Sequence, residues 1–375
     1  MTHHVYLVPG FFGFANLGDL KYFGHVREFL LEAFSRRGLA LQVEVVATRP
    51  TASLPRRAER VLDTIAQTLH DDVGPVHLVG HSSGGLDVRL LLSPGVALPN
   101  DLDVERWVRR VRTAVTVATP HHGTPLAAFF TSLLGRQVLR ALSLSTIHML
   151  RFGSLPVTAL LELGAAIARV DGWVGLNSAL LDQLYEQLLS DFSPERRRAL
   201  TAFFREVEGD QALLTQLTPE AMEVFDACVQ LRPGVRAGSV VTRARQPSLS
   251  ATIAVGLDPA GQATNALYRA LHRLARLPPD RVPTLGDAQA DALRAAFGTL
   301  PDAAANDGVV PTRCQAWGEV IHAIEADHLD VVGHFGDPDH VPPHIDWITT
   351  GSGCTTTRFD ALWNAVVDWI LQDGA

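Results

Sequence analysis

Short apolar runs alternate with amphipathic stretches through the first 125 residues of the chain. Apolar runs bounded by glycine or proline predict strands, and apolar residues that recur every three or four positions predict helices. Strands are predicted over residues 5–8, 42–47, 76–79 and 114–117, and helices over residues 23–37, 56–69 and 86–91. This alternation predicts an α/β fold, with a mostly parallel sheet covered by helices on both faces. Reactive residues are expected at the carboxyl ends of the strands.

The pattern changes near residue 126, where one helical pattern follows another without an intervening strand. The predicted helices cover residues 126–134, 137–144, 155–170, 177–189, 194–207 and 219–229. Most of their apolar positions are expected to form a core of their own. We interpret residues 126–235 as a helical insertion that forms a cap or lid over the strand ends.

Strand signals return after the insertion. Strands are predicted over residues 239–242 and 252–255, and helices over residues 285–297 and 358–372. The chain therefore divides into three parts: residues 1–125 and 236–375 as two halves of an α/β core, and residues 126–235 as the insertion between them.

Composition and charge narrow the classes of partner. The 375 residues, 47 % of them hydrophobic, suffice for one large core with an insertion. A net charge of −8 without a long basic run argues against a nucleic-acid partner. The sequence contains no run of 18 apolar residues, so it predicts no membrane-spanning helix. The three cysteines, Cys228, Cys314 and Cys354, allow one disulfide, such as Cys228–Cys314, and fit three reduced thiols equally well.

The amino terminus enters a predicted strand at once. It has no basic segment followed by an apolar stretch and a small-residue cleavage site. We therefore expect a cytoplasmic protein, or the mature form of a secreted one.

The segment Gly80-His81-Ser82-Ser83-Gly84 carries the strongest chemical signal. It follows the predicted strand at 76–79 and precedes the predicted helix at 86–91. Gly-x-Ser-x-Gly in a strand–turn–helix setting is typical of a nucleophile elbow, whose turn is so tight that glycine is needed two residues before and after the serine. The alternative interpretation is an ordinary glycine-rich turn. Ser82 is the predicted nucleophile.

A serine nucleophile needs a base, and the base needs a carboxylate that orients it. In a chain with such an elbow these partners are expected later, in the order acid, then histidine. Asp307 lies in a turn-forming Asn-Asp-Gly, and His328 follows after an apolar stretch that has room for a strand and a turn. We predict Asp307 as the acid and His328 as the base. Asp327 and Asp330 are rival acids, but both lie close to His328 in sequence.

Two further sites are predicted from loops. An oxyanion hole needs two backbone N–H groups, which we assign to Ser83, after the nucleophile, and Phe11, in the loop after the first strand; the alternative for that loop is a plain glycine-rich turn. His334, His340 and His344 suggest a metal cluster, but we interpret their segment as a solvated, proline-rich loop.

These motifs resemble those of the bacterial true lipases of the α/β-hydrolase superfamily. The matching segments are residues 8–14, 80–84, 118–125, 217–225, 306–308 and 328–330. The resemblance covers residues 5–125 and 300–332 and is patchy in between. Pro9 stands where these lipases have a histidine in the oxyanion loop, and Ser83 stands where a histidine is common.

The resemblance implies an α/β-hydrolase fold, hydrolysis of fatty-acyl glycerol esters and a mobile lid that contacts lipid. It also implies oxyanion donors at the positions of Phe11 and Ser83. The chemistry needs no cofactor, but these lipases hold a structural calcium ion. Its ligands here would be Asp330, two residues after the histidine, and Asp287, although calcium takes six or more oxygen ligands.

The sequence thus predicts a serine ester hydrolase of the lipase type, with Ser82, Asp307 and His328 as the catalytic residues. Two alternatives stay open. One is a soluble carboxylesterase or thioesterase for short acyl groups. The other is a non-catalytic lipid-binding protein with a hydrolase fold.

Overall fold

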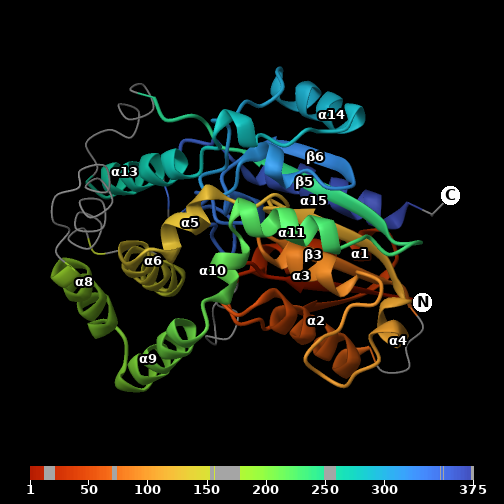
Figure 1. Cartoon of the computed structure of the whole chain (residues 1–375), viewed down its shortest axis with the longest axis horizontal. Helices are drawn as coiled ribbons and strands as arrows, with labels where there is room; N and C mark the ends of the chain where they lie inside the picture. Colours follow the sequence, from red (N-terminus) through yellow and green to blue (C-terminus); the bar gives the residue numbers. More distant parts are fainter. Residues whose placement is uncertain are drawn as a thin grey trace.

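A parallel sheet of six strands organises the part of the chain that the structure describes (Figure 1). The strands are β1 (Thr2–Val8), β2 (Ala40–Val45), β3 (Val76–His81), β4 (Val111–Val117), β5 (Arg236–Arg243) and β6 (Glu319–Glu325), in the order β2-β1-β3-β4-β5-β6. Each neighbouring pair is parallel, so the predicted mostly parallel sheet is confirmed. The strand order reverses between β1 and β3, where open α/β sheets form their ligand crevice.

This computed structural model describes residues 1–11, 22–69, 74–152, 156, 178–248, 259–346, 348 and 350–372. The predicted strand at 252–255 and, apart from residue 156, the predicted helix at 155–170 lie outside these residues. Among the described helices, none is both long and apolar enough to cross a membrane. Cys228, Cys314 and Cys354 are all free thiols.

Alternate side chains of the strands pack against helices on opposite faces of the sheet. On β1, Val5 and Leu7 belong to a core with α1 (Gly24–Arg36) and α15 (Thr356–Leu371). Tyr6 and Val8 belong to a second core, which they share with α2 (Leu54–Thr68), α3 (Gly84–Leu91) and α4 (Val104–Val108). The period-two alternation of a strand thus gives both faces an apolar layer, as a sheet covered on both sides requires.

The described part of the chain between β4 and β5 consists mainly of helices. Its helices are α5 (Pro125–Thr131), α6 (Leu133–Phe152), α8 (Ser178–Ser190), α9 (Pro194–Gly209), α10 (Ala212–Gln216) and α11 (Pro219–Cys228). Three of them begin at a Ser/Thr-Pro pair, in which Thr124, Ser193 or Thr218 accepts a hydrogen bond from a backbone N–H of the first turn. Helices α8 and α9 lie on the side of the molecule away from both chain ends (Figure 1).

The second half of the core adds α13 (Pro259–Leu274), α14 (Asp287–Phe297) and α15 around β5 and β6. The buried face of α15 is the predicted one: Phe359, Leu362, Trp363, Val366, Val367 and Ile370. Helix α13 is absent from the sequence prediction, although Leu267, Tyr268 and Leu271 are buried at helical spacing. It packs against α5 and thereby forms one wall of the site described next.

Candidate active site

Ser82 occupies the turn between β3 and α3, with a backbone φ of 56°. This left-handed conformation is unfavourable for a residue with a side chain. A Cβ on Gly80 would lie 2.5 Å from the carbonyl carbon of Gly84, and a Cβ on Gly84 would lie 2.2 Å from the carbonyl oxygen of Val8. The N–H of Ser82 donates to the carbonyl of Val117 at 2.8 Å. The turn therefore holds Ser82 at the carboxyl ends of β1, β3 and β4.

The loop after β1 packs directly against Ser82. A Cβ on Gly10 would lie 2.4 Å from Ser82 Cβ and 2.9 Å from Ser82 Oγ. Phe11, the next residue, is buried. Ser83 is the N-cap residue of α3, at the positive end of that helix. The structure thus places the backbone of both predicted oxyanion positions next to the predicted nucleophile.

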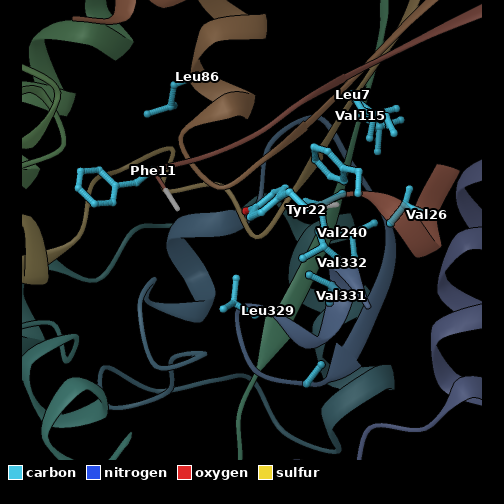
Figure 2. Close-up of a cluster of buried hydrophobic side chains, with 14 of the residues drawn as sticks. Leu7, Phe11, Tyr22, Val26, Leu86, Val115, Val240, Leu329, Val331 and Val332 are labelled. Atoms are coloured by element: carbon cyan, nitrogen blue, oxygen red, sulfur yellow. The ribbon is translucent and has the colours of Figure 1, made fainter. Parts of the chain in front are cut away.

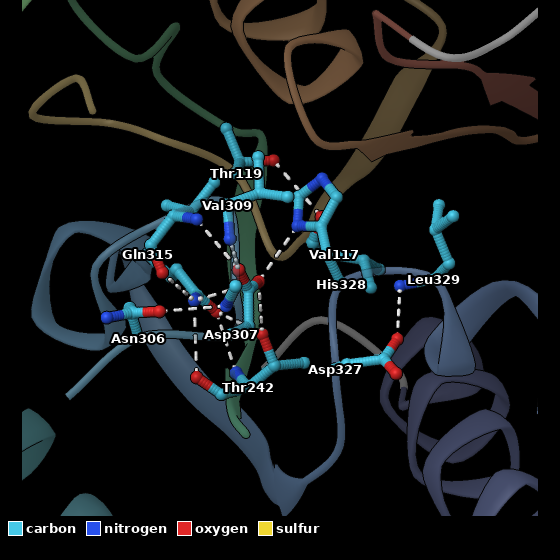
Figure 3. Close-up of polar contacts among 12 residues, drawn as sticks. Val117, Thr119, Thr242, Asn306, Asp307, Val309, Gln315, Asp327, His328 and Leu329 are labelled. Carbon is cyan, nitrogen blue, oxygen red and sulfur yellow. Dashed lines mark hydrogen bonds and ion pairs between the residues drawn. The ribbon is translucent and has the colours of Figure 1, made fainter. Parts of the chain in front are cut away.

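His328 and Asp307 form a buried pair. His328 Nδ1 lies 2.8 Å from Asp307 Oδ2, and the two side chains are 4 % and 0 % exposed. Figure 3 shows the ring of His328 turned toward this carboxylate. Because a carboxylate accepts, Nδ1 carries the proton and Nε2 keeps its lone pair. His328 Nε2 is buried and has no hydrogen-bond partner among the described residues, so it is available to a reacting group.

The carboxylate of Asp307 is held by five hydrogen-bond donors. Its Oδ1 accepts from the N–H groups of Val309 at 2.9 Å and Val310 at 2.7 Å. Its Oδ2 accepts from Thr242 Oγ1 at 2.8 Å and Gln315 Nε2 at 3.3 Å, in addition to His328. Thr242 and Gln315 were not singled out in the sequence, because neither is near Asp307 in a recognisable motif.

The Asn-Asp-Gly turn fixes the backbone on which this acid stands. Gly308 has a φ of +94°, and its N–H donates to Asn306 Oδ1 at 2.9 Å. Asn306 Nδ2 donates in turn to the carbonyl of His272 at 3.0 Å. The asparagine and the glycine therefore give the short acid one orientation, toward the ends of β5 and β6.

His81, the residue before Ser82, links the elbow to the histidine loop. Its Nε2 lies 2.8 Å from the carbonyl oxygen of His328, and its Nδ1 lies 2.5 Å from the hydroxyl of Tyr22. Burial is the main cause that lowers the pKa of His81 well below its usual value, so the ring is neutral. Figure 2 shows Tyr22 among apolar side chains that include Val331 and Val332, just after His328.

A buried ion pair lies next to the loop that follows β1. Arg57 Nη2 is 2.7 Å from Asp87 Oδ2, and both side chains are fully buried. The same nitrogen donates to the carbonyl of Pro9 at 2.7 Å, and Arg57 Nη1 donates to the carbonyl of Arg49 at 2.7 Å. Arg57 on α2 therefore links the start of the loop after β1 to α3, the helix that follows Ser82.

The rival acids make other bonds. Asp327 Oδ1 accepts from the N–H of Leu329 at 2.9 Å (Figure 3). The same oxygen accepts from the N–H of Asp330 at 3.0 Å, and Asp327 Oδ2 accepts from Thr350 Oγ1 at 2.9 Å. Asp330 Oδ2 accepts from the N–H of Asp327 at 2.8 Å. Both carboxylates thus stabilise the backbone turn around His328, and of these three acids it is Asp307 that bonds to the ring.

The structure does not bring the two predicted calcium ligands together. Asp287 begins α14, where Gln289 donates to the carbonyl of Gly318 at 2.9 Å, at the amino end of β6. Asp330 follows the carboxyl end of β6, so the strand separates them by about 20 Å. Spacing along the chain did not reveal which end of the sheet Asp287 would occupy. This pair does not fit a shared calcium ion.

A pocket with mainly apolar walls opens beside His328 and Asp307. Its apolar side chains come from α5, α13 and the loops before and after β6: Leu126, Phe130, Tyr268, Leu271, Val309, Leu329 and Ile348. Three further ionisable side chains, Asp327, His334 and Asp346, also line it. Burial lowers the pKa of His334 to about 4, so this ring favours the neutral form. The pocket therefore suits an apolar group.

Comparison with solved structures finds bacterial lipases. The fold is similar to that of lipase 1 from Pelosinus fermentans, with a TM-score of 0.50 and 17 % identity over 100 % of this chain and 99 % of that one. The Staphylococcus hyicus lipase aligns with a TM-score of 0.51 and 13 % identity, over 98 % of this chain and 95 % of that one. No protein-family model and no curated protein sequence matches. The resemblance inferred from the motifs is thereby confirmed at the level of the fold, which is the α/β-hydrolase fold of these lipases.

Proposed function

We propose that the chain is a serine ester hydrolase that cleaves apolar carboxylic esters through an acyl-enzyme. The observation that carries this proposal is the buried Asp307–His328 pair, whose free Nε2 belongs to the loop bonded to His81, directly before Ser82. The strained turn at Ser82, with Gly10 packed against it, supports the same assignment. The lipases of similar fold agree with this class of reaction.

In the proposed reaction, His328 Nε2 removes the proton of Ser82 Oγ as this oxygen attacks the ester carbonyl. The protonated ring stays paired with Asp307, which stabilises its charge. His328 then gives the proton to the departing alcohol. A water molecule, activated in the same way, cleaves the acyl-enzyme and restores Ser82. None of these steps requires a cofactor.

The negative charge that develops on the carbonyl oxygen needs donors already in place. We assign the backbone N–H groups of Phe11 and Ser83 to this role. The approach of Gly10 to Ser82 supports the first, and the position of Ser83 at the start of α3 supports the second. Arg57 supports both, because it bonds to the carbonyl of Pro9 and to Asp87 on α3.

The apolar pocket beside His328 favours a substrate with an apolar acyl group. Its walls include Leu126 and Phe130 on α5, the first helix of the segment between β4 and β5. We propose that this segment acts as the lid of a lipase-like enzyme and that the substrate is a lipidic ester. A carboxylesterase for short acyl groups is the second candidate, because the same residues would serve it.

Hydrolysis of p-nitrophenyl esters from acetyl to palmitoyl tests the proposal. We expect activity in the wild type and none above background in Ser82→Ala, with highest activity on long chains. A maximum at acetyl or butyryl would identify the short-chain esterase. Ser190→Ala, which changes an exposed serine on α8, is the matched control and should keep full activity.

A fluorophosphonate probe tests the nucleophile directly. Ser82 Oγ should displace fluoride and form a phosphorus–oxygen bond that mass spectrometry locates on the peptide containing residue 82. Activity that survives in Ser82→Ala, or label on another serine, would disprove the assignment. Absence of both activity and label in the folded wild type would instead favour the non-catalytic lipid-binding protein.

A further inference from the structure

Three histidines converge outside the candidate active site. His25 lies on α1, and His340 and His344 follow β6 in the segment after the catalytic loop. Each offers a ring nitrogen, and these nitrogens all lie within 4.8 Å of one another. His334 is not part of this group, because it is buried beside the pocket. The cluster thus differs from the one considered in the sequence, and His344 is buried rather than solvated.

The hydrogen bonds of two members set their tautomers. His344 Nδ1 lies 2.7 Å from the carbonyl oxygen of Gly333, and His340 Nδ1 lies 2.7 Å from that of Pro342. A carbonyl oxygen only accepts, so each Nδ1 carries a proton and each Nε2 keeps its lone pair. A ring whose second nitrogen donates to a backbone carbonyl is the usual arrangement of a metal-ligating histidine.

The backbone around the cluster is shaped to bring the rings together. Gly333 has a φ of +100°, and a Cβ there would lie 2.8 Å from His25 Cβ. The ring of His344 lies between those of His25, at 3.7 Å, and Phe335, at 4.2 Å, measured between centroids. Two backbone hydrogen bonds between His344 and Asp337, at 3.0 and 3.2 Å, fix the segment further. These contacts therefore hold the three rings close to one another.

The charges around the cluster suit a cation. Asp337 and Asp360 act on His344 with negative charge. Two carboxylates near three imidazole rings would balance the charge of a divalent ion.

We propose that His25, His340 and His344 bind a divalent transition metal, with zinc as the ion that three imidazole ligands favour. His340 and His344 would bind through Nε2, and His25 through one of its ring nitrogens. Zinc–nitrogen bonds of about 2.0–2.1 Å require nitrogen separations of about 3.4 Å. The rings therefore move closer on binding, and His25 tilts out of its stack with His344 so that their lone pairs converge.

The bound ion would fasten α1 to the segment that follows the catalytic histidine. This segment runs from Gly333 to His344 and continues to Asp346, which lines the pocket. The proposal does not depend on the proposed esterase activity, because the site has its own ligands and its own readouts. Its role is structural: the ion stabilises one border of the pocket.

Zinc binding to protein made without a histidine tag, treated with chelator and dialysed, tests the site. Isothermal titration calorimetry with Zn²⁺ should show one equivalent bound, and the melting temperature should rise with the metal. Co²⁺ should give the visible absorption bands of a site with nitrogen ligands. Absence of stoichiometric binding of both metals to the wild type would overturn the proposal.

Variants identify the ligands. His340→Ala and His25→Gln should each weaken zinc binding at least about 100-fold. His3→Ala and His122→Ala, which remove histidines from other parts of the surface, are the matched controls and should bind as the wild type does. Equal binding by the double variant His25→Gln/His340→Ala would overturn the proposal, as would loss of binding in His3→Ala. The melting temperature of each metal-free variant, compared with that of the metal-free wild type, shows that lost binding does not reflect unfolding.

Discussion

His81 and His328 are joined by a hydrogen bond of 2.8 Å from His81 Nε2 to the carbonyl oxygen of His328. On the other side of the His81 ring, the hydroxyl of Tyr22 lies 2.5 Å from Nδ1. The residue before the candidate nucleophile therefore sets the position of the loop that carries the candidate base. The ring centroids of the two histidines are 4.8 Å apart, so movement of either ring would displace the other.

Replacement of His81 should impair catalysis through the position of His328. In His81→Leu the carbonyl of His328 loses its donor, and an unpaired buried acceptor costs about 1–3 kcal/mol of unfolding free energy. We expect kcat to fall by about 10- to 100-fold while KM changes little, because misplacement of about 1 Å can have that effect. Steady-state kinetics on a p-nitrophenyl ester and a thermal melt measure both.

The conservative variant separates positioning from mere stability. His81→Gln keeps an N–H group that can reach the carbonyl, so it should recover part of kcat. A His81→Leu protein with unchanged kcat well below its melting temperature would show that this hydrogen bond does not position the base.

Asp307→Asn should abolish catalysis through the tautomer of His328. The Asn oxygen would accept from the N–H groups of Val309 and Val310, as Oδ1 does now, so its NH₂ group would face His328 Nδ1. Nδ1 would then have to accept, and Nε2 would carry the proton and lose its function as a base. We expect kcat to fall by about 10⁴-fold, the size known for this change in a serine protease.

Asp327→Asn is the matched control for that substitution. Asp327 is the neighbouring acid, yet its carboxylate bonds to backbone N–H groups and Thr350 rather than to His328. Its kcat should stay within a few-fold of the wild type. A larger loss in Asp327→Asn than in Asp307→Asn would transfer the orienting role to Asp327.

The sequence revealed those parts of the site that depend on local conformation. The turn at Ser82 needs glycine at positions 80 and 84, and its strand and helix are adjacent in the chain, so a short window contains the whole motif. Asp307 has a similar local signature in its Asn-Asp-Gly turn. The alternation of strands and helices predicted the parallel sheet for the same reason, since each element has its own periodicity.

The sequence did not reveal contacts between distant segments. Arg57 pairs with Asp87 and His81 bonds to His328 only because the fold places α2 beside α3 and the elbow beside the histidine loop. Asp287 was chosen by its distance from Asp307 along the chain, but the helix it begins runs along β6 from the other end. Such pairings depend on the three-dimensional path of the chain.

Gly10→Ala should remove activity because of the close approach of Gly10 to the nucleophile. The added Cβ would lie 2.4 Å from Ser82 Cβ and 2.9 Å from the carbonyl oxygen of His81, so the loop or the elbow must move. Loss of one oxyanion donor typically lowers kcat by about 10²–10³-fold, and we expect at least the lower value. Gly209→Ala, where nothing lies within 4 Å of the new Cβ, should keep full activity. A kcat in Gly10→Ala equal to that of the wild type would argue against close packing of the proposed oxyanion loop on Ser82.

The buried carboxyl of Asp327 should make stability depend on pH. Burial is the main cause that raises its pKa from 3.8 to about 6. Between these values the folded protein holds a proton that the unfolded chain releases, so this contribution to stability is fully present below pH 4 and is lost as the pH rises through 6. Asp327→Asn removes the titration and keeps an oxygen that accepts from the backbone N–H groups. The unfolding free energy of the variant relative to the wild type should therefore increase by about 2–3 kcal/mol between pH 4 and pH 8.

Urea unfolding of both proteins across this pH range measures the difference. Buried histidines such as His81, whose pKa is lowered, contribute stability that is lost as the pH falls, but they do so in both proteins and cancel in the comparison. The pKa of Asp330 is raised mainly by burial and next by the charge of Asp327, so removal of the Asp327 charge also reduces the cost of ionising Asp330 above pH 6. Asp280→Asn, which changes an exposed acid, should show a flat difference. A flat difference for Asp327→Asn as well would mean that its carboxyl is ionised throughout and that the hydrogen bonds of the turn after His328 outweigh the cost of its burial.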